Sequence, residues 1–280
     1  MPAEDLLEYV SALLDWQTKT ALSGEKPPIL DFDDADMDDE DYECYTGLNR
    51  EHFDDLLSHV QQDLRNSAVR SVRQALGLLL CKLRMDNSQE QLRRLCGMSQ
   101  PTVSEAISAV LNALDQNFTP LNLGYDHISR EDFIAQHQTD VTTVLCNRQP
   151  NAAVAVLDGT YLEVQKSSNF CFQRDTYSML KSWNLLKPMM ICAPDGYILN
   201  AEALFYGSDN DATMMNYCMH FSSFLDYFEE QDVMIVYRGF RDVLPAVWAS
   251  RIETFMPHFL QPGQKQFTTE QANDNRIVSD

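Results

Sequence analysis

Residues 152–164 read AAVAVLDGTYLEV, and they mark a change of period along the chain. A nearly continuous apolar run of this length, following a region of helical spacing, is typical of a mostly buried strand. Asp158 lies inside the run, where an unpaired carboxylate costs several kcal/mol unless it is paired or bound to a metal. The residue therefore indicates a functional site, although an Asp-Gly turn beside a strand end is the ordinary alternative.

The segments after this strand alternate between strand and helix patterns. Residues 187–207, KPMMICAPDGYILNAEALFYG, predict two strands joined by a tight turn at Pro194-Asp195-Gly196. Residues 209–228 predict one amphipathic helix with an acidic first turn, as the helix dipole prefers. Residues 232–240, DVMIVYRGF, predict a further strand. This order predicts an α/β fold, with a mixed sheet that begins with a hairpin and carries helices packed on it.

The region upstream, from Thr46, is helical in pattern for about 70 residues. Within it, residues 87–114 read NSQEQLRRLCGMSQPTVSEAISAVLNAL. Ser88 and Gln91 have the spacing of a capping box, Gly97 fits a helix end, and Ser99 fits the start of the next helix. Two helices joined by a short turn predict an all-α domain of the helix-turn-helix type.

A helix-turn-helix reads DNA with the first residues of its second helix. The candidate DNA contacts are therefore Ser99, Gln100, Thr102 and Ser104, with Glu105 beside them. Arg93 and Arg94 are candidates for phosphate contacts, together with Arg70, Arg73, Lys82 and Arg84. A helical hairpin without a DNA role is the alternative, because the pattern is loose and the second helix carries little positive charge.

The net charge of −21 is concentrated near the N-terminus. Residues 1–45 carry 14 acidic and 2 basic residues, whereas residues 46–150 carry 12 and 10, and residues 151–280 carry 16 and 9. Pro2–Ala21 has the pattern of an amphipathic helix. Residues 31–43 hold nine acids, so we expect them to form an extended, solvated linker. The alternative is an interaction tail that binds a protein partner, or a mimic of DNA.

These patterns divide the chain into an N-terminal helix with acidic linker (1–45), a helical domain (46–150) and an α/β domain (151–280). The seven cysteines form no C-x-x-C pair, which favours free thiols in a reducing compartment over disulfides or zinc. The acidic N-terminus and the lack of a long apolar run favour a protein with no membrane span. We expect a nuclear location, or one shared between nucleus and cytoplasm.

Several segments together resemble the transposase domain of the PIF/Harbinger superfamily and its domesticated nuclease relatives. They are AVLDGTYLEVQKSS, DTYSMLKSWNLLKPMMICAPDGYILNAEALFYGSDND, VYRGFRD and MPHFLQPGQKQFTTEQANDNR, in this order. YTGLNREHFDDLL and SQEQLRRLCGMSQPTVSEAI resemble the helix-turn-helix region that precedes this domain in the family. The resemblance covers roughly Tyr45 to the C-terminus and implies a ribonuclease-H-like fold, here incomplete at its C-terminal end.

The resemblance also implies a site where acidic side chains hold two divalent ions, Mg²⁺ or Mn²⁺. Asp158 and Asp211 match the first two acids of the family and are the candidate catalytic and metal-binding residues. The third acid precedes R-G-F in the family, but here Tyr237 stands in its place. The last Glu follows the A-N-x-x-R segment in the family, and here Asp280 ends the sequence before that position. Asp242, Glu270 and Asp280 lie near these positions without matching them.

A phenol with a pKa near 10 is a poor substitute for a carboxylate ligand at neutral pH. The sequence therefore predicts a transposase-derived, metal-dependent endonuclease homologue that is catalytically impaired, with Tyr237 as a degenerate site position. The alternative is a binding protein instead of an enzyme, namely a domesticated DNA-binding or adaptor protein without catalysis. A scaffold acting through its acidic segment is the third.

Overall fold

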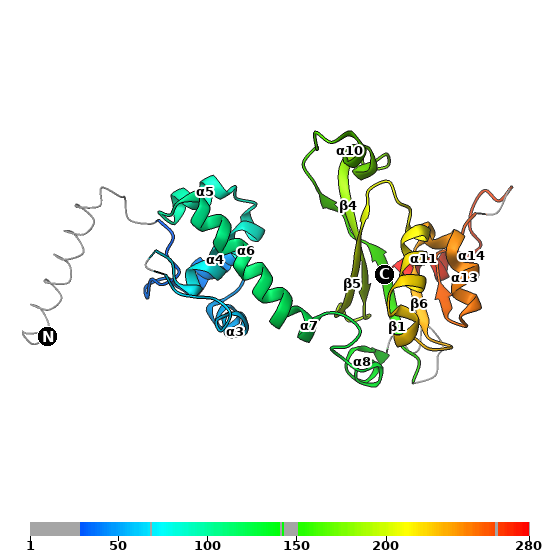
Figure 1. The fold of residues 1–280 in the computed structure, drawn as a ribbon. Helices are drawn as coiled ribbons and strands as arrows, with labels where there is room; N and C mark the ends of the chain where they lie inside the picture. The colour runs from blue at the N-terminus through cyan, green and yellow to red at the C-terminus, as the bar shows by residue number, and fades with distance from the viewer. Residues whose placement is uncertain (1–28, 68, 141, 143–150, 261–262, 280) are drawn as a thin grey trace, which may run out of the picture. The chain divides into compact units, whose positions relative to one another are not determined.

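The computed structural model describes residues 29–280 except 68, 141, 143–150, 261–262 and 280. The described residues divide into two compact units between Thr119 and Pro120 (Figure 1). The amphipathic helix predicted for Pro2–Ala21 lies outside the described residues. No described helix is long and apolar enough to span a bilayer. The cysteines in the described part of the chain are free thiols.

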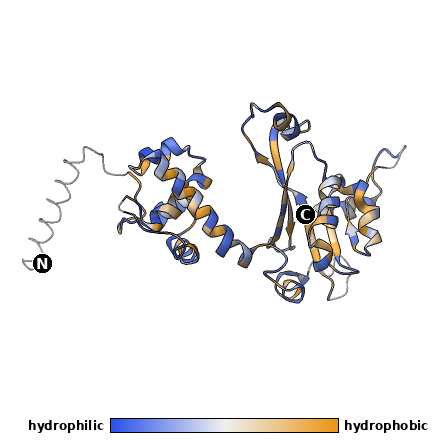
Figure 2. Ribbon diagram, in the orientation of Figure 1, coloured by the Kyte–Doolittle hydropathy of each residue, from blue (hydrophilic) through white to orange (hydrophobic). Residues whose placement is uncertain are grey.

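The N-terminal unit is helical, and its elements follow the predicted capping signals. Ser88 begins α5 with a complete capping box to Gln91, and Ser99 accepts a hydrogen bond from the Thr102 amide at the start of α6. Gly97, in the turn between them, has a φ of 63°, which favours glycine. Figure 2 shows apolar and polar residues alternating along these helices. The helices are α2 (Asp39–Thr46), α3 (Arg50–Val60), α4 (Val72–Met85), α5 (Gln89–Leu95) and α6 (Gln100–Asn117).

The acidic segment at residues 31–43 is not the extended, solvated linker that its charge predicts. Phe32 and Tyr42 are buried in the helical core, where the Phe32 ring stacks on Phe53 with centroids 5.7 Å apart. The aspartates face outward and satisfy the backbone: Asp31 accepts from the Asp33 amide, and Asp38 caps α2. The prediction was wrong because two aromatic rings gain more from burial than the exposed carboxylates lose by repulsion.

The C-terminal unit is a mixed sheet with helices packed on it. Its strands are β1 (Val154–Gly159), β2 (Leu162–Glu163), β3 (Tyr177–Ser178), β4 (Trp183–Cys192), β5 (Ile198–Tyr206), β6 (Val233–Val236) and β7 (Glu253–Phe255). Its helices are α7 (Thr119–Asn122, at the division between the units), α8 (Arg130–His137), α10 (Phe170–Thr176), α11 (Asp211–Phe221), α12 (Phe224–Tyr227), the 3-10 helix η1 (Arg238–Val243), α13 (Leu244–Ala249) and α14 (Thr269–Ser279).

The sheet has the order β5-β4-β1-β6-β7, with β2 and β3 paired to the outer part of β4. Strand β1 is antiparallel to β4 and parallel to β6, and β6 is parallel to β7. The predicted hairpin is therefore confirmed, with Gly196 at a φ of 94° in its turn. The predicted strand 152–164 is interrupted at Thr160 and Tyr161, after which β2 continues along β4.

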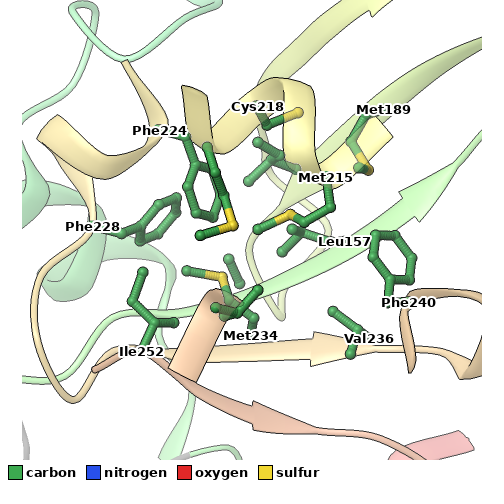
Figure 3. Close-up of a cluster of buried hydrophobic side chains, with 14 of the residues drawn as sticks. Leu157, Met189, Met215, Cys218, Phe224, Phe228, Met234, Val236, Phe240 and Ile252 are labelled. Carbon is green, nitrogen blue, oxygen red and sulfur yellow. The ribbon is translucent and has the colours of Figure 1, made fainter. Parts of the chain in front are cut away.

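The core of this unit lies between the sheet and α11, η1 and α13. Figure 3 shows Leu157 of β1, Met189 of β4 and Met234 of β6 meeting Met215 of α11 and Phe240 of η1. The helix predicted at 209–228 is broken, because α11 ends at Phe221 and α12 begins at Phe224. The Ser222 hydroxyl donates to the Cys218 carbonyl at this break and helps to end α11.

Helix α8 belongs to the sheet-bearing unit. Phe133 is fully buried in the core under the sheet, and Arg130 pairs with the buried carboxylate of Asp232 at the start of β6. The Asp232 carboxylate also accepts the Ala153 and Glu229 amides, so its charge is well compensated. The predicted domain boundary between residues 150 and 151 therefore differs from the division observed between residues 119 and 120.

Candidate functional site

Asp158 is the last residue but one of β1, at the edge where β1 and β6 both end. The side chain before it, Leu157, is buried in the core, and Asp158 points away from that core into solvent. Its Oδ1 accepts a hydrogen bond of 2.8 Å from the Gly159 amide. The strand thus presents a carboxylate at the sheet edge, with a buried glycine directly after it.

Asp211 reaches the same edge from another element, as the first residue of α11. Asn210 caps the helix, and the helix N-terminus favours a negative charge at this position. Burial raises the pKa of Asp211, the Lys187 ammonium lowers it, and the Asp158 carboxylate raises it further. The two predicted acids therefore lie within electrostatic reach of each other.

Gly239 lies against the Asp211 carboxylate. A Cβ atom at Gly239 would lie 1.9 Å from Asp211 Oδ2, closer than any real contact allows. Gly159 lies on the Asp158 side, where its Cβ would lie 3.7 Å from Asp211 Oδ1. Gly239 of the R-G-F segment is therefore needed for the close approach of η1 to α11. This approach keeps η1, which follows β6, beside the two acids.

Lys187 of β4 is a member of the site that the sequence analysis did not single out. It is buried, its Nζ lies 3.9 Å from Asp211 Oδ1, and it donates a hydrogen bond to the Asp209 carbonyl oxygen. A lysine inside the apolar strand LLKPMMIC was the available signal, because a buried ammonium requires a partner of opposite charge.

Tyr237 follows β6 directly and stands at the edge that Asp158 and Asp211 share. Its side chain is 45% exposed. Desolvation is the largest cause that raises the pKa of Tyr237. Electrostatic interactions with Asp211, Tyr161 and Asp158, in that order, raise it further. The structure thus brings together the two predicted acids and the predicted degenerate position.

The residues present do not fit a pair of divalent ions. No group of three or more His, Cys, Asp or Glu side chains that could hold a metal occurs among the described residues. Two carboxylates remain at this edge, and the Lys187 ammonium already lies against one of them. A fixed positive charge repels a divalent cation and offers no lone pair to bind it. Asp242, five residues after Tyr237, is exposed and paired with Arg241.

The candidate DNA contacts of the helical unit lie around the start of α6. Ser99 and Thr102 share a hydrogen bond of 2.8 Å, Gln100 donates to the Gln89 side chain, and Ser104 accepts from it. These polar side chains are therefore near one another, but several of them already hold the two helices together. DNA binding by this helix pair stays a prediction.

The two candidate arginines of α5 are held by one carboxylate. Arg93 forms a two-pronged pair with Glu90 at 2.8 and 3.0 Å, and Arg94 binds the same carboxylate at 2.9 Å. The two guanidinium groups hold the pKa of Glu90 at about 2. Any phosphate contact by these arginines therefore competes with Glu90.

Arg73, a candidate phosphate contact, has its guanidinium group engaged in contacts within the helical unit. Its guanidinium pairs with Asp54 at 2.6 Å and donates to the Tyr42 hydroxyl and the Phe32 carbonyl. It also lies over the Tyr42 and Phe53 rings. Arg73 therefore ties the acidic segment to the helical core.

The geometry is that of a mixed sheet with two aspartates at one edge. Asp158 comes from the end of β1, beside β6, and Asp211 comes from the start of α11. Residues 157–280 match the family model described as DDE superfamily endonuclease. Over these residues the chain is similar to DDE-type, transposase-derived endonuclease domains, and its mixed α/β architecture is consistent with a DDE nuclease fold. No curated protein and no solved structure matches the chain at a significant level.

Proposed function

We propose that the chain is a catalytically impaired relative of the PIF/Harbinger DNA endonucleases that keeps the ability to bind DNA. The observation that carries the proposal is the phenol of Tyr237 at the edge shared by Asp158 and Asp211. The sheet order supports a ribonuclease-H-like fold, because an antiparallel hairpin beside three parallel strands sets β1 and β6 side by side. In that arrangement the two strands deliver their terminal residues to one place.

The chemistry of phosphodiester cleavage explains why this replacement matters. Related enzymes use ions held by several carboxylates to activate the attacking oxygen and to stabilise the leaving oxygen. Here the third carboxylate position carries a neutral phenol whose pKa is raised above its ordinary value. Lys187 supplies one fixed positive charge at Asp211, which satisfies that carboxylate without providing a site for an ion. The remaining groups hold the architecture of the site but lack the ligands for its reaction.

A plasmid-nicking assay tests the impairment. The purified chain is incubated with supercoiled DNA and either Mg²⁺ or Mn²⁺, beside the Asp158→Asn variant. We expect no divalent-dependent nicking above the background of the variant. Nicking by the native chain that Asp158→Asn abolishes would show that the site is active and would overturn the proposal.

A DNA-binding adaptor without catalysis is the second candidate, and the exposed polar start of α6 favours it. Gln100 and its neighbours lie at the end of a helix whose N-terminal turn contains no acidic residue. A gel shift with the full chain at low salt tests this function, because phosphate contacts are strongest there. We expect a weak complex that salt dissociates; no complex at low salt would contradict DNA binding.

A further inference from the structure

The part of the chain from the end of β1 to the first residue of β4 forms an arm, defined here as residues 161–183. It contains β2, α10, β3 and the start of β4. Figure 1 shows α10 at the end of β4 that lies away from α11 and α13. Helix α10 packs on β4, so the arm is supported by the sheet but lies outside the main core.

The arm exposes large apolar side chains to solvent. Phe170 and Met179 are each 86% exposed, and Trp183 is 62% exposed. Leu180, Tyr177, Phe172 and Tyr161 add to this surface. Isolated exposed apolar residues are ordinary, but a concentration of rings and aliphatic chains in one short segment marks an interaction surface.

The charge of the arm differs from the charge of the rest of the chain. Residues 161–183 carry three basic side chains, Lys166, Arg174 and Lys181, and two acidic ones. The whole chain carries twice as many acids as bases, 42 against 21. Arg174 is paired with Asp175, so Lys166 and Lys181 stand against the single carboxylate of Glu163. The arm therefore carries a net charge of +1 on a chain whose net charge is −21, and it repels a polyanion less than the rest of the chain does.

One cation and one ring of the arm are already arranged together. The Lys181 ammonium lies 4.8 Å from the centre of the Tyr161 ring. Flat aromatic faces with adjacent cations are the combination that binds single-stranded nucleic acid, since bases stack on the rings and phosphates meet the cations.

Tyr161 connects the arm to the candidate site. Desolvation raises the pKa of Tyr161, and the charges of Asp211 and Asp158 raise it further. The tyrosine therefore lies within electrostatic reach of both acids. A strand bound along the arm would reach the sheet edge that carries them.

We propose that the arm is a binding site for unpaired nucleotides of DNA. The proposal rests on the proposed function in one respect, that the ligand of this domain is DNA. The unpaired form follows from the aromatic surface, because base faces are available for stacking only outside the duplex. Trp183 and Phe170 provide the stacking faces, and Lys181 provides a phosphate contact.

Fluorescence anisotropy with the full chain tests the arm. The probes are labelled dT20 and a labelled 20-base-pair duplex, both at low salt. We expect dT20 to bind more tightly than the duplex, and we expect Phe170→Ala and Trp183→Ala each to weaken dT20 binding roughly tenfold. Lys181→Gln is expected to reduce the salt dependence of dT20 binding.

Trp248→Ala is the matched control, because Trp248 is 55% exposed on α13, outside the arm. We expect this variant to bind dT20 like the native chain. Circular dichroism checks that each variant is folded; the high exposure of Phe170 makes its replacement harmless to the core.

Three results would overturn the proposal. The native chain fails to bind dT20, the arm variants bind it as tightly as the native chain, or the native chain is a dimer that Phe170→Ala converts to a monomer. The last result would assign the surface to self-association. Plasmid nicking by the native chain would refute the impairment alone and leave the arm's tests unaffected.

Discussion

Replacement of Phe32 by alanine tests how the acidic segment is held. The Phe32 side chain is 1% exposed and stacks on Phe53. It also lies so close to α4 that a Cβ at Gly77 would be 2.1 Å from its ring. Loss of a fully buried phenylalanine costs about 3–5 kcal/mol. The backbone of Phe32 keeps its hydrogen bond to Gln74, so we expect about 3 kcal/mol, near the lower end.

Hydrogen exchange of α4 in the full chain measures this loss in the helical unit alone. A loss of about 3 kcal/mol corresponds to exchange that is faster by about a hundredfold. Ile29→Ala is the matched control, because Ile29 lies three residues before Phe32 and is 77% exposed. We expect a change within about 0.5 kcal/mol for this control. If α4 exchanges equally fast in both variants, the segment is not packed on the helical core and the reasoning fails.

Three further perturbations address the charged groups. Glu90→Gln is expected to strengthen DNA binding two- to fivefold at low salt, because it frees two guanidinium groups of α5. A gel shift measures this, with the exposed Asp115→Asn as the control. Equal strengthening by the control would show that the change in net charge alone is responsible. Tyr237→Asp is expected to raise Mn²⁺ affinity about tenfold in a calorimetric titration, since it adds a third carboxylate. The variant is nevertheless expected to leave plasmid DNA intact, because the last acidic ligand is still absent. Robust cleavage would contradict this assignment of the last ligand. Because burial raises the pKa of Asp211, this group's contribution to stability is present below about pH 3.9 and is lost as the pH rises through its folded pKa. The urea midpoint of Asp211→Asn, taken relative to that of the native chain, is therefore expected to rise between pH 4 and pH 7, and an equal difference at both values would show that the group's ionisation is not responsible.

Local signals in the sequence predicted several elements of both units. The Ser88 capping box, the turn at Gly196 and the apolar strand before Tyr237 each act over a few residues, so their patterns are visible in the chain itself. The convergence of Asp158 and Asp211 required the family resemblance, because their approach depends on how β1 and α11 pack.

The features that were missed depend on contacts between distant residues. Arg130 meets Asp232 across 102 positions of sequence, and no local pattern assigns α8 to the sheet. The burial of Phe32 and Tyr42 was missed because the high charge of residues 31–43 predicted a solvated segment, and only these two rings interrupt its many acids. Lys187 was recognisable only as an unexplained charge in an apolar strand, since its partner lies on another element.

Mn²⁺ binding to the native chain, measured by electron paramagnetic resonance, tests the central claim most directly. The claim is that two carboxylates, a phenol and a buried ammonium do not hold the ion pair of an active DDE nuclease. We expect no tightly bound pair of ions per chain and no difference between the native protein and Asp158→Asn. Two tightly bound Mn²⁺ ions per chain, both lost in Asp158→Asn, would contradict the account.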